Sequence, residues 1–282
     1  SKPNEGQLSC VALMDARSIA ATSANGGKLT SALGIEAGEN IPKYFFDKTI
    51  YEGRVYDGFG KPEPDTKLEM GPNIKDWPEI PALSQNLLLK VVAHITDPVT
   101  TTDELIPSGE TASFRSNPLR LAEFTLSRKD PGYVTRAKAF PAPGEVERVL
   151  SKLDNAPDIS TVTAGSPVYA IMPGGGSARE QAASGQRVLG AAANIAHGYA
   201  TKRYRSNLIN WGMLPFTTDA DVPMDAYAYV PNIQQAISEA WAEIPATVIT
   251  DEGLSQIKLS VGALTEDERQ ILLDGCLINF YR

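Results

Sequence analysis

The sequence contains few of the residues that build a metal site or a disulfide framework. It has two cysteines, Cys10 and Cys276, and two histidines, His94 and His197, among 282 residues. Small secreted folds that depend on disulfides contain several cysteine pairs, and zinc sites and iron–sulfur clusters usually take three or four Cys or His ligands. We therefore expect no disulfide framework and no metal ligand set within this chain.

The sequence also lacks a basic surplus and a long apolar run. Lys and Arg number 26 against 34 Asp and Glu, which gives a net charge of −8. A protein that neutralises nucleic-acid phosphates needs a basic surplus, so a nucleic-acid partner is disfavoured. No segment approaches the roughly 20 apolar residues of a membrane-spanning helix, and no signal-peptide pattern is present. We expect a soluble, cytoplasmic protein without a membrane partner.

The length, 282 residues, suggests about two domains. The first segment predicts a strand at Gln7–Met14 and then a helix, with Asp15 as its N-cap and Gly26-Gly27 as its end. Residues 44–56 favour a short hairpin. Residues 57–82 contain many prolines, which predicts a linker, with a long surface loop in one domain as the alternative.

The region after residue 82 alternates apolar runs with helical patterns. This order predicts an α/β fold with a mainly parallel sheet and covering helices. Near the C-terminus, Thr265 and Glu268 form a capping-box pattern that opens the last helix. The predicted strands are 87–95, 166–172 and 191–196, and the predicted helices are 118–127, 144–153, 177–189, one ending at Asn210 before Gly212, and 266–278.

The segment Pro173–Ala183, with the sequence PGGGSAREQAA, follows a predicted buried strand. Glycines allow a sharp turn and a close approach to a ligand, and the N-terminus of the next helix favours an anion. Ser177 lies where the turn enters the helix, and Arg179 follows two residues later. The pattern is neither a P-loop nor a dinucleotide fingerprint. It predicts an anion site, and the alternative is a structural turn with Ser177 as a simple N-cap.

A second candidate segment is Thr100–Glu104, followed by Arg115. Hydroxyl groups and a carboxylate placed after a strand can orient a base or a cation. An arginine can bind a substrate carboxylate through two parallel hydrogen bonds. The alternative for this segment is a solvated loop with a surface arginine.

The two segments together resemble the aconitase family. The sequence PGGGSAREQAASGQRVLGAAANIAHGYATKRYRSNLINWGMLPF is similar to its swivelling C-terminal domain, and Thr101-Thr102-Asp103 is similar to the family's T-T-D-H motif. The family's substrate arginine follows that aspartate by twelve residues, the position of Arg115. The opening of the chain resembles the last strand and helix of the cluster-bearing core. The resemblance implies a swivelling β/β/α domain at 83–282, a linker at 57–82, and a core-domain tail at 1–56.

The resemblance also implies an activity, the dehydration and rehydration of hydroxy di- or tricarboxylates at a [4Fe–4S] cluster. By match, Ser177 is the base that takes the carbon-bound proton and Arg179 is its partner and a substrate ligand. Gly176 and Arg115 would also bind substrate, and Asp103 belongs to the catalytic network. A free serine is a weak base, so helix-start amides and Arg179 must stabilise its alkoxide.

No cluster-cysteine motif lies in this chain. We therefore expect a C-terminal fragment, inactive alone, whose cluster is held by N-terminal core domains of the same protein. Three departures from the family motifs, Ala178, Gln181 and Glu104, support a second reading of the sequence. This reading is a non-catalytic anion-binding or regulatory module that keeps the swivel fold.

Overall fold

The computed structural model describes residues 12–33, 43–52, 58–67 and 69–282. The chain divides into two compact units, residues 1–67 and 68–282. Within the described ranges, every helix is too short or too polar to cross a lipid bilayer.

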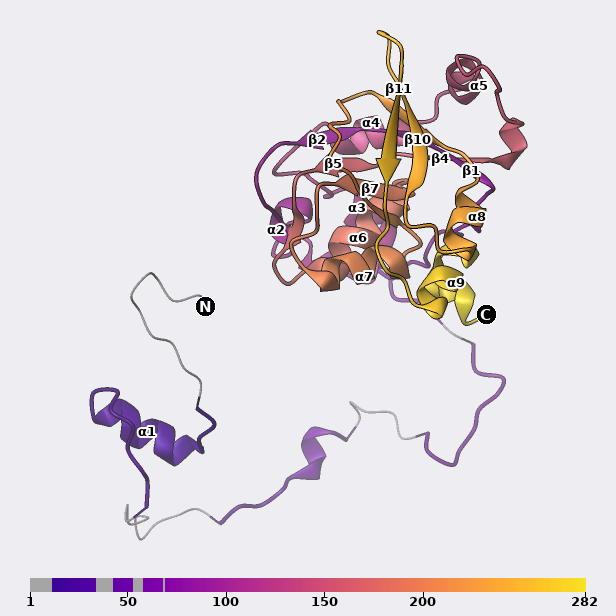
Figure 1. Ribbon diagram of the computed structural model, residues 1–282. Helices are drawn as coiled ribbons and strands as arrows, with labels where there is room; N and C mark the ends of the chain where they lie inside the picture. The colour runs from indigo at the N-terminus through magenta and orange to yellow at the C-terminus, as the bar shows by residue number, and fades with distance from the viewer. Residues whose placement is uncertain (1–11, 34–42, 53–57, 68) are drawn as a thin grey trace. The chain divides into compact units, whose positions relative to one another are not determined.

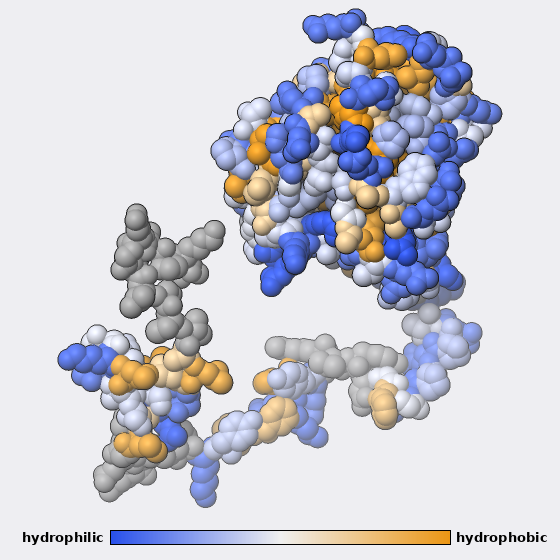
Figure 2. Space-filling view, in the orientation of Figure 1, coloured by the Kyte–Doolittle hydropathy of each residue, from blue (hydrophilic) through white to orange (hydrophobic). Residues whose placement is uncertain are grey.

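The first unit contains the predicted helix, α1 (Ala16–Ala24). The Asp15 carboxylate accepts hydrogen bonds from the backbone N–H groups of Arg17 and Ser18 at 2.9 and 3.1 Å, so the predicted N-cap is confirmed. None of the residues of α1 is buried, and Ile19 is 52% exposed. Figure 2 shows apolar side chains at the surface of this unit. The predicted strand at Gln7–Met14 lies largely outside the described residues.

The prediction of a hairpin at 44–56 is wrong for the part that the structure describes. Residues 43–52 form no strand and contain instead a 3₁₀ turn, Lys48–Ile50. The Asp47 side chain accepts a hydrogen bond from the Thr49 N–H group at 3.0 Å, which favours the turn over an extended chain. Residues 53–57 lie outside the described ranges.

The second unit is an α/β fold with two main sheets (Figure 1). The five-stranded sheet has the order β11-β10-β9-β1-β4, and the four-stranded sheet has the order β2-β5-β7-β8. A short pair, β3 and β6, forms a third sheet. The strands are β1 (Asn86–Lys90), β2 (Ala93–Ile95), β3 (Thr100–Thr101), β4 (Val162–Gly165), β5 (Val168–Ala170), β6 (Pro173–Gly175), β7 (Ala193–Ala196), β8 (Leu214–Thr217), β9 (Tyr227–Val230), β10 (Ile244–Ile249) and β11 (Leu254–Leu259).

The prediction of parallel strands covered by helices is confirmed. All pairs in the four-stranded sheet are parallel. In the five-stranded sheet only β1 and β4 are parallel, and the other pairs are antiparallel. The sequence analysis assigned no strand to the segment that forms β8 to β11. The helices of this unit are α2 (Thr102–Leu105), α3 (Pro118–Ala122), α4 (Tyr133–Ala139), α5 (Glu145–Leu150), α6 (Arg179–Val188), α7 (Lys202–Asn210), α8 (Ile233–Ser238), α9 (Glu266–Asp274) and α10 (Leu277–Phe280).

The single strand predicted at 87–95 is two strands in two different sheets. The chain passes between the sheets at Val91 and Val92, whose N–H groups donate to Ala226 at 3.0 Å and to Pro167 at 3.2 Å. Both valines are buried, so the apolar run is continuous although the sheet partner changes. This crossing places the four-stranded sheet between the five-stranded sheet and helices.

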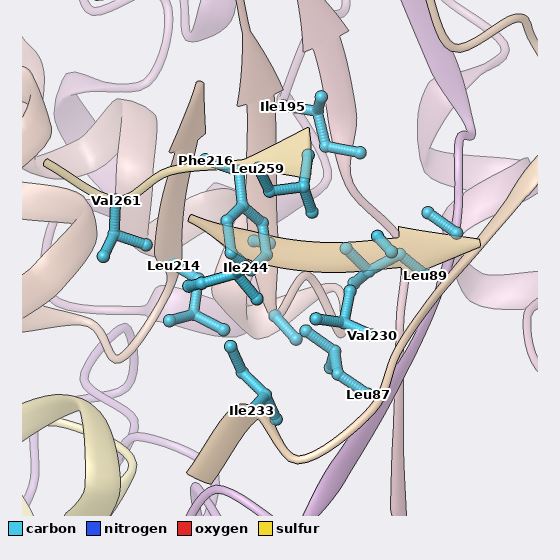
Figure 3. Close-up of a cluster of buried hydrophobic side chains, with 14 of the residues drawn as sticks. Leu87, Leu89, Ile195, Leu214, Phe216, Val230, Ile233, Ile244, Leu259 and Val261 are labelled. Carbon is cyan, nitrogen blue, oxygen red and sulfur yellow. The ribbon is translucent and has the colours of Figure 1, made fainter. Parts of the chain in front are cut away.

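Three buried clusters show the layers. The first lies between the two main sheets and includes Leu87 of β1, Ile195 of β7 and Phe216 of β8 (Figure 3). The second joins the other face of the four-stranded sheet to α3, α4, α6 and α7. The third packs α5 on the outer face of the five-stranded sheet. The order sheet, sheet, helices agrees with the predicted β/β/α domain.

Part of the proline-rich stretch belongs to the second unit and packs on the rest of it. The ring of Trp77 lies 4.2 Å from that of Trp211, and the Lys75 N–H group donates to the Ser116 carbonyl at 3.0 Å. The Ile80 carbonyl accepts a bond from the Asn279 side chain at 2.8 Å. The assignment of 1–56 to a core-domain tail, and of 57–82 to a linker, stays a prediction.

Candidate functional site

Parallel pairing of β3 with β6 brings the two candidate segments together. Thr100 pairs with Pro173 and Thr101 pairs with Gly175, although about 70 residues of sequence separate the strands. Each strand runs directly into a helix, α2 after β3 and α6 after the glycine turn. The threonine segment and the glycine segment therefore lie side by side.

Two glycines of the turn are required by close contacts. Gly176 has φ +123°, and a Cβ atom there would lie 2.4 Å from the Oγ1 atom of Thr102. Gly174 has φ +97°, and its Cβ would lie 2.3 Å from the ring of Tyr204. Because these φ values and contacts admit only glycine, the turn can pass tightly between α2 and α7.

Ser177 and Arg179 lie at the start of α6. The N-cap residue is Ala178, and no side chain caps the helix. Ser177 is exposed, and within the described residues its hydroxyl makes no hydrogen bond, so it is not the N-cap of the alternative reading. The free N–H groups of the first turn and the positive end of the helix dipole remain available to an anion.

A shallow hollow of about 330 Å³ gathers three of the predicted site residues, Arg115, Ser177 and Arg179. Neither guanidinium forms an ion pair with a described residue, and the Arg179 Nε atom is buried without a hydrogen-bond partner. A buried donor without a partner is costly, which favours a ligand that accepts from it. The lining residues are Ser108, Arg115, Ser177, Ala178, Arg179, Glu180 and Gln181.

Asp103, the third residue predicted to be catalytic, does not line the hollow. Its carboxylate accepts a bond from Arg128 at 2.8 Å and from the backbone N–H group of Ser108 at 3.3 Å. Ser108 lines the hollow, so Asp103 contacts the site only at the loop that follows α2. The sequence analysis did not single out Ser108, because nothing local distinguishes it from other loop serines.

Glu104, which stands where the family motif has histidine, stabilises the start of α2. Its carboxylate accepts from the Thr101 N–H group at 2.7 Å, and the Thr101 hydroxyl accepts from the Glu104 N–H group at 3.2 Å, which completes a capping box for α2. The bond from the Thr101 backbone lowers the pKa of Glu104 and outweighs desolvation, and Lys129 lowers it further. Glu104 is therefore held as an anion by α2 and Lys129, away from the residues that line the hollow.

The described residues do not fit a resident metal cluster. Within ranges 12–33, 43–52, 58–67 and 69–282, no three His, Cys, Asp or Glu side chains are placed to hold a metal ion. Cys276 is buried at the start of α10, away from the residues that line the hollow. A cluster at this site would need ligands from outside the described residues.

A second hollow, of about 470 Å³, lies on the five-stranded sheet. Its cation Lys90 is already paired with Glu145 at 2.8 Å, and Lys152 lies 3.4 Å from Asp251. The smaller hollow at Ser177 is the better candidate, because among the described residues that line the two hollows only Arg179 has a buried side-chain nitrogen without a partner.

Comparisons with known proteins agree with the resemblance. The sequence model of the family described as "Aconitase C-terminal domain" matches residues 162–221. A crystal structure of 3-isopropylmalate dehydratase from Methanocaldococcus jannaschii is similar to this chain, with a TM-score of 0.43 and 21% identity over 69% of this chain and 93% of that one. No curated protein matches the chain. The part that matches this family model, residues 162–221, includes the glycine turn, Ser177 and Arg179.

Proposed function

We propose that this chain is one part of an aconitase-like hydro-lyase and supplies its serine base and substrate arginines. One observation carries the proposal, the hollow in which Ser177 lies beside two guanidinium groups without ion-pair partners among the described residues. The substrate class is a hydroxy di- or tricarboxylate. Its carboxylates are the groups that arginines bind with two parallel hydrogen bonds.

Ser177 is the base in this proposal. As an alkoxide it takes a proton from the carbon next to a substrate carboxylate, the C–H electron pair forms a C=C bond, and hydroxide leaves the neighbouring carbon. The reverse reaction adds the hydroxide and returns the proton. A serine alkoxide needs strong stabilisation, which the uncapped first turn of α6 and Arg179 supply.

Arg115 and Arg179 hold the substrate in one reactive pose. They come from different elements, a loop after a 3₁₀ turn (Ala112–Phe114) and the start of α6. Two fixed cations can bind two carboxylates of one molecule and so fix its orientation relative to Ser177. Gly176 contributes by the absence of a side chain, because it lets the turn approach Thr102.

The [4Fe–4S] cluster of the family belongs, in this proposal, to N-terminal core domains of the same protein. These domains are also the proposed protein partner. The described residues of this chain hold no ligand set for the cluster.

A second candidate function is a non-catalytic anion-binding or regulatory module. The same hollow supports it, because two unpaired guanidinium groups bind an anion with or without chemistry. Ala178 and Gln181, which stand where the family motif has serine and histidine, favour it. The two functions differ only in what Ser177 does.

Binding is tested first, with the 282-residue chain and malate as a hydroxy-dicarboxylate probe. We expect R115A and R179A each to weaken malate binding about ten-fold or more, the effect of losing a charge-assisted hydrogen bond. R120A is the matched control, because Arg120 is exposed and lies over the rings of Phe114 and Phe124 instead of in the hollow. If all three variants lost the same malate affinity, the effect would come from the change in net charge and not from a specific site.

Catalysis is tested with the protein that includes its core domains. We expect S177A to keep malate affinity within about two-fold but to lose turnover of the substrate by a factor of about 10³ or more, as expected for the loss of a base or nucleophile. Unchanged turnover in S177A would remove the serine from catalysis. Binding without any wild-type turnover would favour the regulatory module.

A further inference from the structure

We propose that Tyr204 is a positioning residue, whose ring and hydroxyl fix the glycine turn and α6 relative to each other and thereby place Ser177 and Arg179. This positioning role rests on the proposed function in one respect only, the measurement of malate affinity described below. Tyr204 lies on α7 and is fully buried. The sequence analysis placed it in a basic run on a helix and gave it no role.

The ring of Tyr204 forms the surface beneath the glycine turn. A Cβ atom at Gly174 would lie 2.3 Å from the ring atoms Cγ and Cδ1, so the backbone of the turn is directly against the ring. The hydroxyl of Thr201, which caps α7, donates to the Gly174 carbonyl at 3.0 Å. The first turn of α7 therefore holds the glycine turn from two sides.

The hydroxyl of Tyr204 reaches two elements that follow the turn in the sequence, α6 and β7. It accepts hydrogen bonds from Gln186 Nε2 of α6 at 2.9 Å and from Asn194 Nδ2 of β7 at 3.0 Å. All three side chains are at most 1% exposed. Desolvation raises the pKa of Tyr204, so the hydroxyl stays protonated at neutral pH.

Burial of the Tyr204 hydroxyl costs free energy, which indicates that the hydroxyl has a specific role. A Phe side chain could fill the same apolar cluster, which already contains Leu208 and Ala182. Instead, three polar side chains are buried, and Gln186 Oε1 and Asn194 Oδ1 have no partner among the described residues. Networks of this kind fix one arrangement of the elements that they join. Here the arrangement fixed is that of Gly174 and α6, the two ends of the segment that carries Ser177.

The test compares Y204F with Y199F in the 282-residue chain. Tyr199 is the matched control, because its ring lies 6.3 Å from that of Tyr204 while its hydroxyl donates to the Phe216 carbonyl at 3.1 Å, on β8. The first measurement is amide hydrogen exchange at residues 175–181 without ligand. We expect exchange to rise about five-fold or more in Y204F, the range of one lost hydrogen bond, and less than two-fold in Y199F.

The second measurement is malate affinity in the same variants. We expect Kd to rise about five-fold in Y204F, because Ser177 and Arg179 lose their fixed placement. If Y204F does not fold, Q186M removes the same bond from the α6 side and should give the same exchange pattern. The proposal would be overturned if amide exchange at residues 175–181 were as fast in Y199F as in Y204F, or as in Q186M where that variant is used. Faster exchange together with no malate binding by the wild type would support the positioning role and count against the proposed function.

Discussion

At the residue scale, the cations of this protein fall into two kinds. Arg115 and Arg179 have no anionic partner among the described residues and line the candidate site. Lys90 instead bonds to Glu145 at 2.8 Å, and its ammonium lies 5.5 Å from the Tyr227 ring centre. Lys90 is thus held by the fold, whereas the two arginines are free to bind a ligand.

The pair Lys90–Glu145 predicts a pH dependence of stability. Burial acts to raise the pKa of Glu145, but hydrogen bonds from Lys90, Tyr227 and the Ala142 N–H group outweigh it and lower the pKa to about 2. Because the folded-state value lies below the unfolded one, the stabilisation is fully present above about pH 5 and is lost as the pH falls toward 2. Glu145 is 7% exposed, so the effect is of the order of 2–3 kcal/mol.

The E145Q variant tests this prediction. At pH 7 we expect the free energy of unfolding in urea to fall by about 2–3 kcal/mol, because the variant leaves Lys90 without its partner. The difference from the wild type should shrink between pH 5 and pH 2. E147Q, on the same helix but exposed, should change the free energy by less than about 0.5 kcal/mol. A difference for E145Q that does not vary with pH would contradict the assignment.

At the element scale, helix starts were easier to predict than helix ends. The Thr265–Glu268 capping box is confirmed, because both of its bonds lie within four residues of sequence. The last helix was predicted to run to residue 278, which is wrong. It ends at Asp274, because Gly275 has φ +94° and a Cβ there would lie 2.2 Å from the Pro81 carbonyl oxygen. That contact comes from a residue far away in the sequence, which no local pattern indicates.

The ends of α7 and α9 pack backbone against backbone, and a glycine substitution tests this. Gly212, after α7, has φ +65°, and a Cβ there would lie 1.7 Å from the Gly275 carbonyl oxygen. We expect G212A to lower the free energy of unfolding by about 3 kcal/mol or more, from left-handed strain plus overpacking. G144A is the control, because Gly144 has φ +72° with open space around it. G144A should lower the free energy of unfolding only by the backbone strain, about 1–2 kcal/mol. If G144A and G212A lowered it equally, overpacking would not contribute at Gly212.

At the scale of the whole molecule, the buried core belongs to the second unit. Every residue of the three buried clusters, with the partly buried residues packed against them, lies between Ile80 and Phe280. The described part of the first unit has a helix without a buried residue and exposes Phe45 and Phe46. Burial of apolar surface is the main stabilising contribution in folding, so the second unit contains what it needs to fold alone.

A chain of residues 68–282 tests this independence. We expect it to unfold in one cooperative thermal transition, with a midpoint within about 4 °C of that of the full chain, which corresponds to a change near 1 kcal/mol. Circular dichroism and calorimetry would measure the two midpoints. A shortened chain without a cooperative transition would show that residues 1–67 contribute to the core.

The sequence by itself determined the features that depend on neighbouring residues. These are the α/β class, the glycine turn, the Asp15 and Thr265 caps, and the similarity of residues 162–221 to the aconitase C-terminal domain. Each depends on hydrogen bonds or φ values within a few positions, or on a motif with fixed spacing. The pairing of Thr101 with Gly175 could be expected only through the family resemblance.

Only the tertiary structure decided which side chains share the hollow and what supports it. It separated Asp103, which holds Ser108, from Arg115, which lines the hollow, and it placed Tyr204 beneath Gly174. It also divided residues 87–95 between two sheets, because the partners of Val91 and Val92 lie far away in the sequence. Local patterns specify which conformations a segment can adopt, whereas long-range contacts select one of them and bring distant side chains into a site.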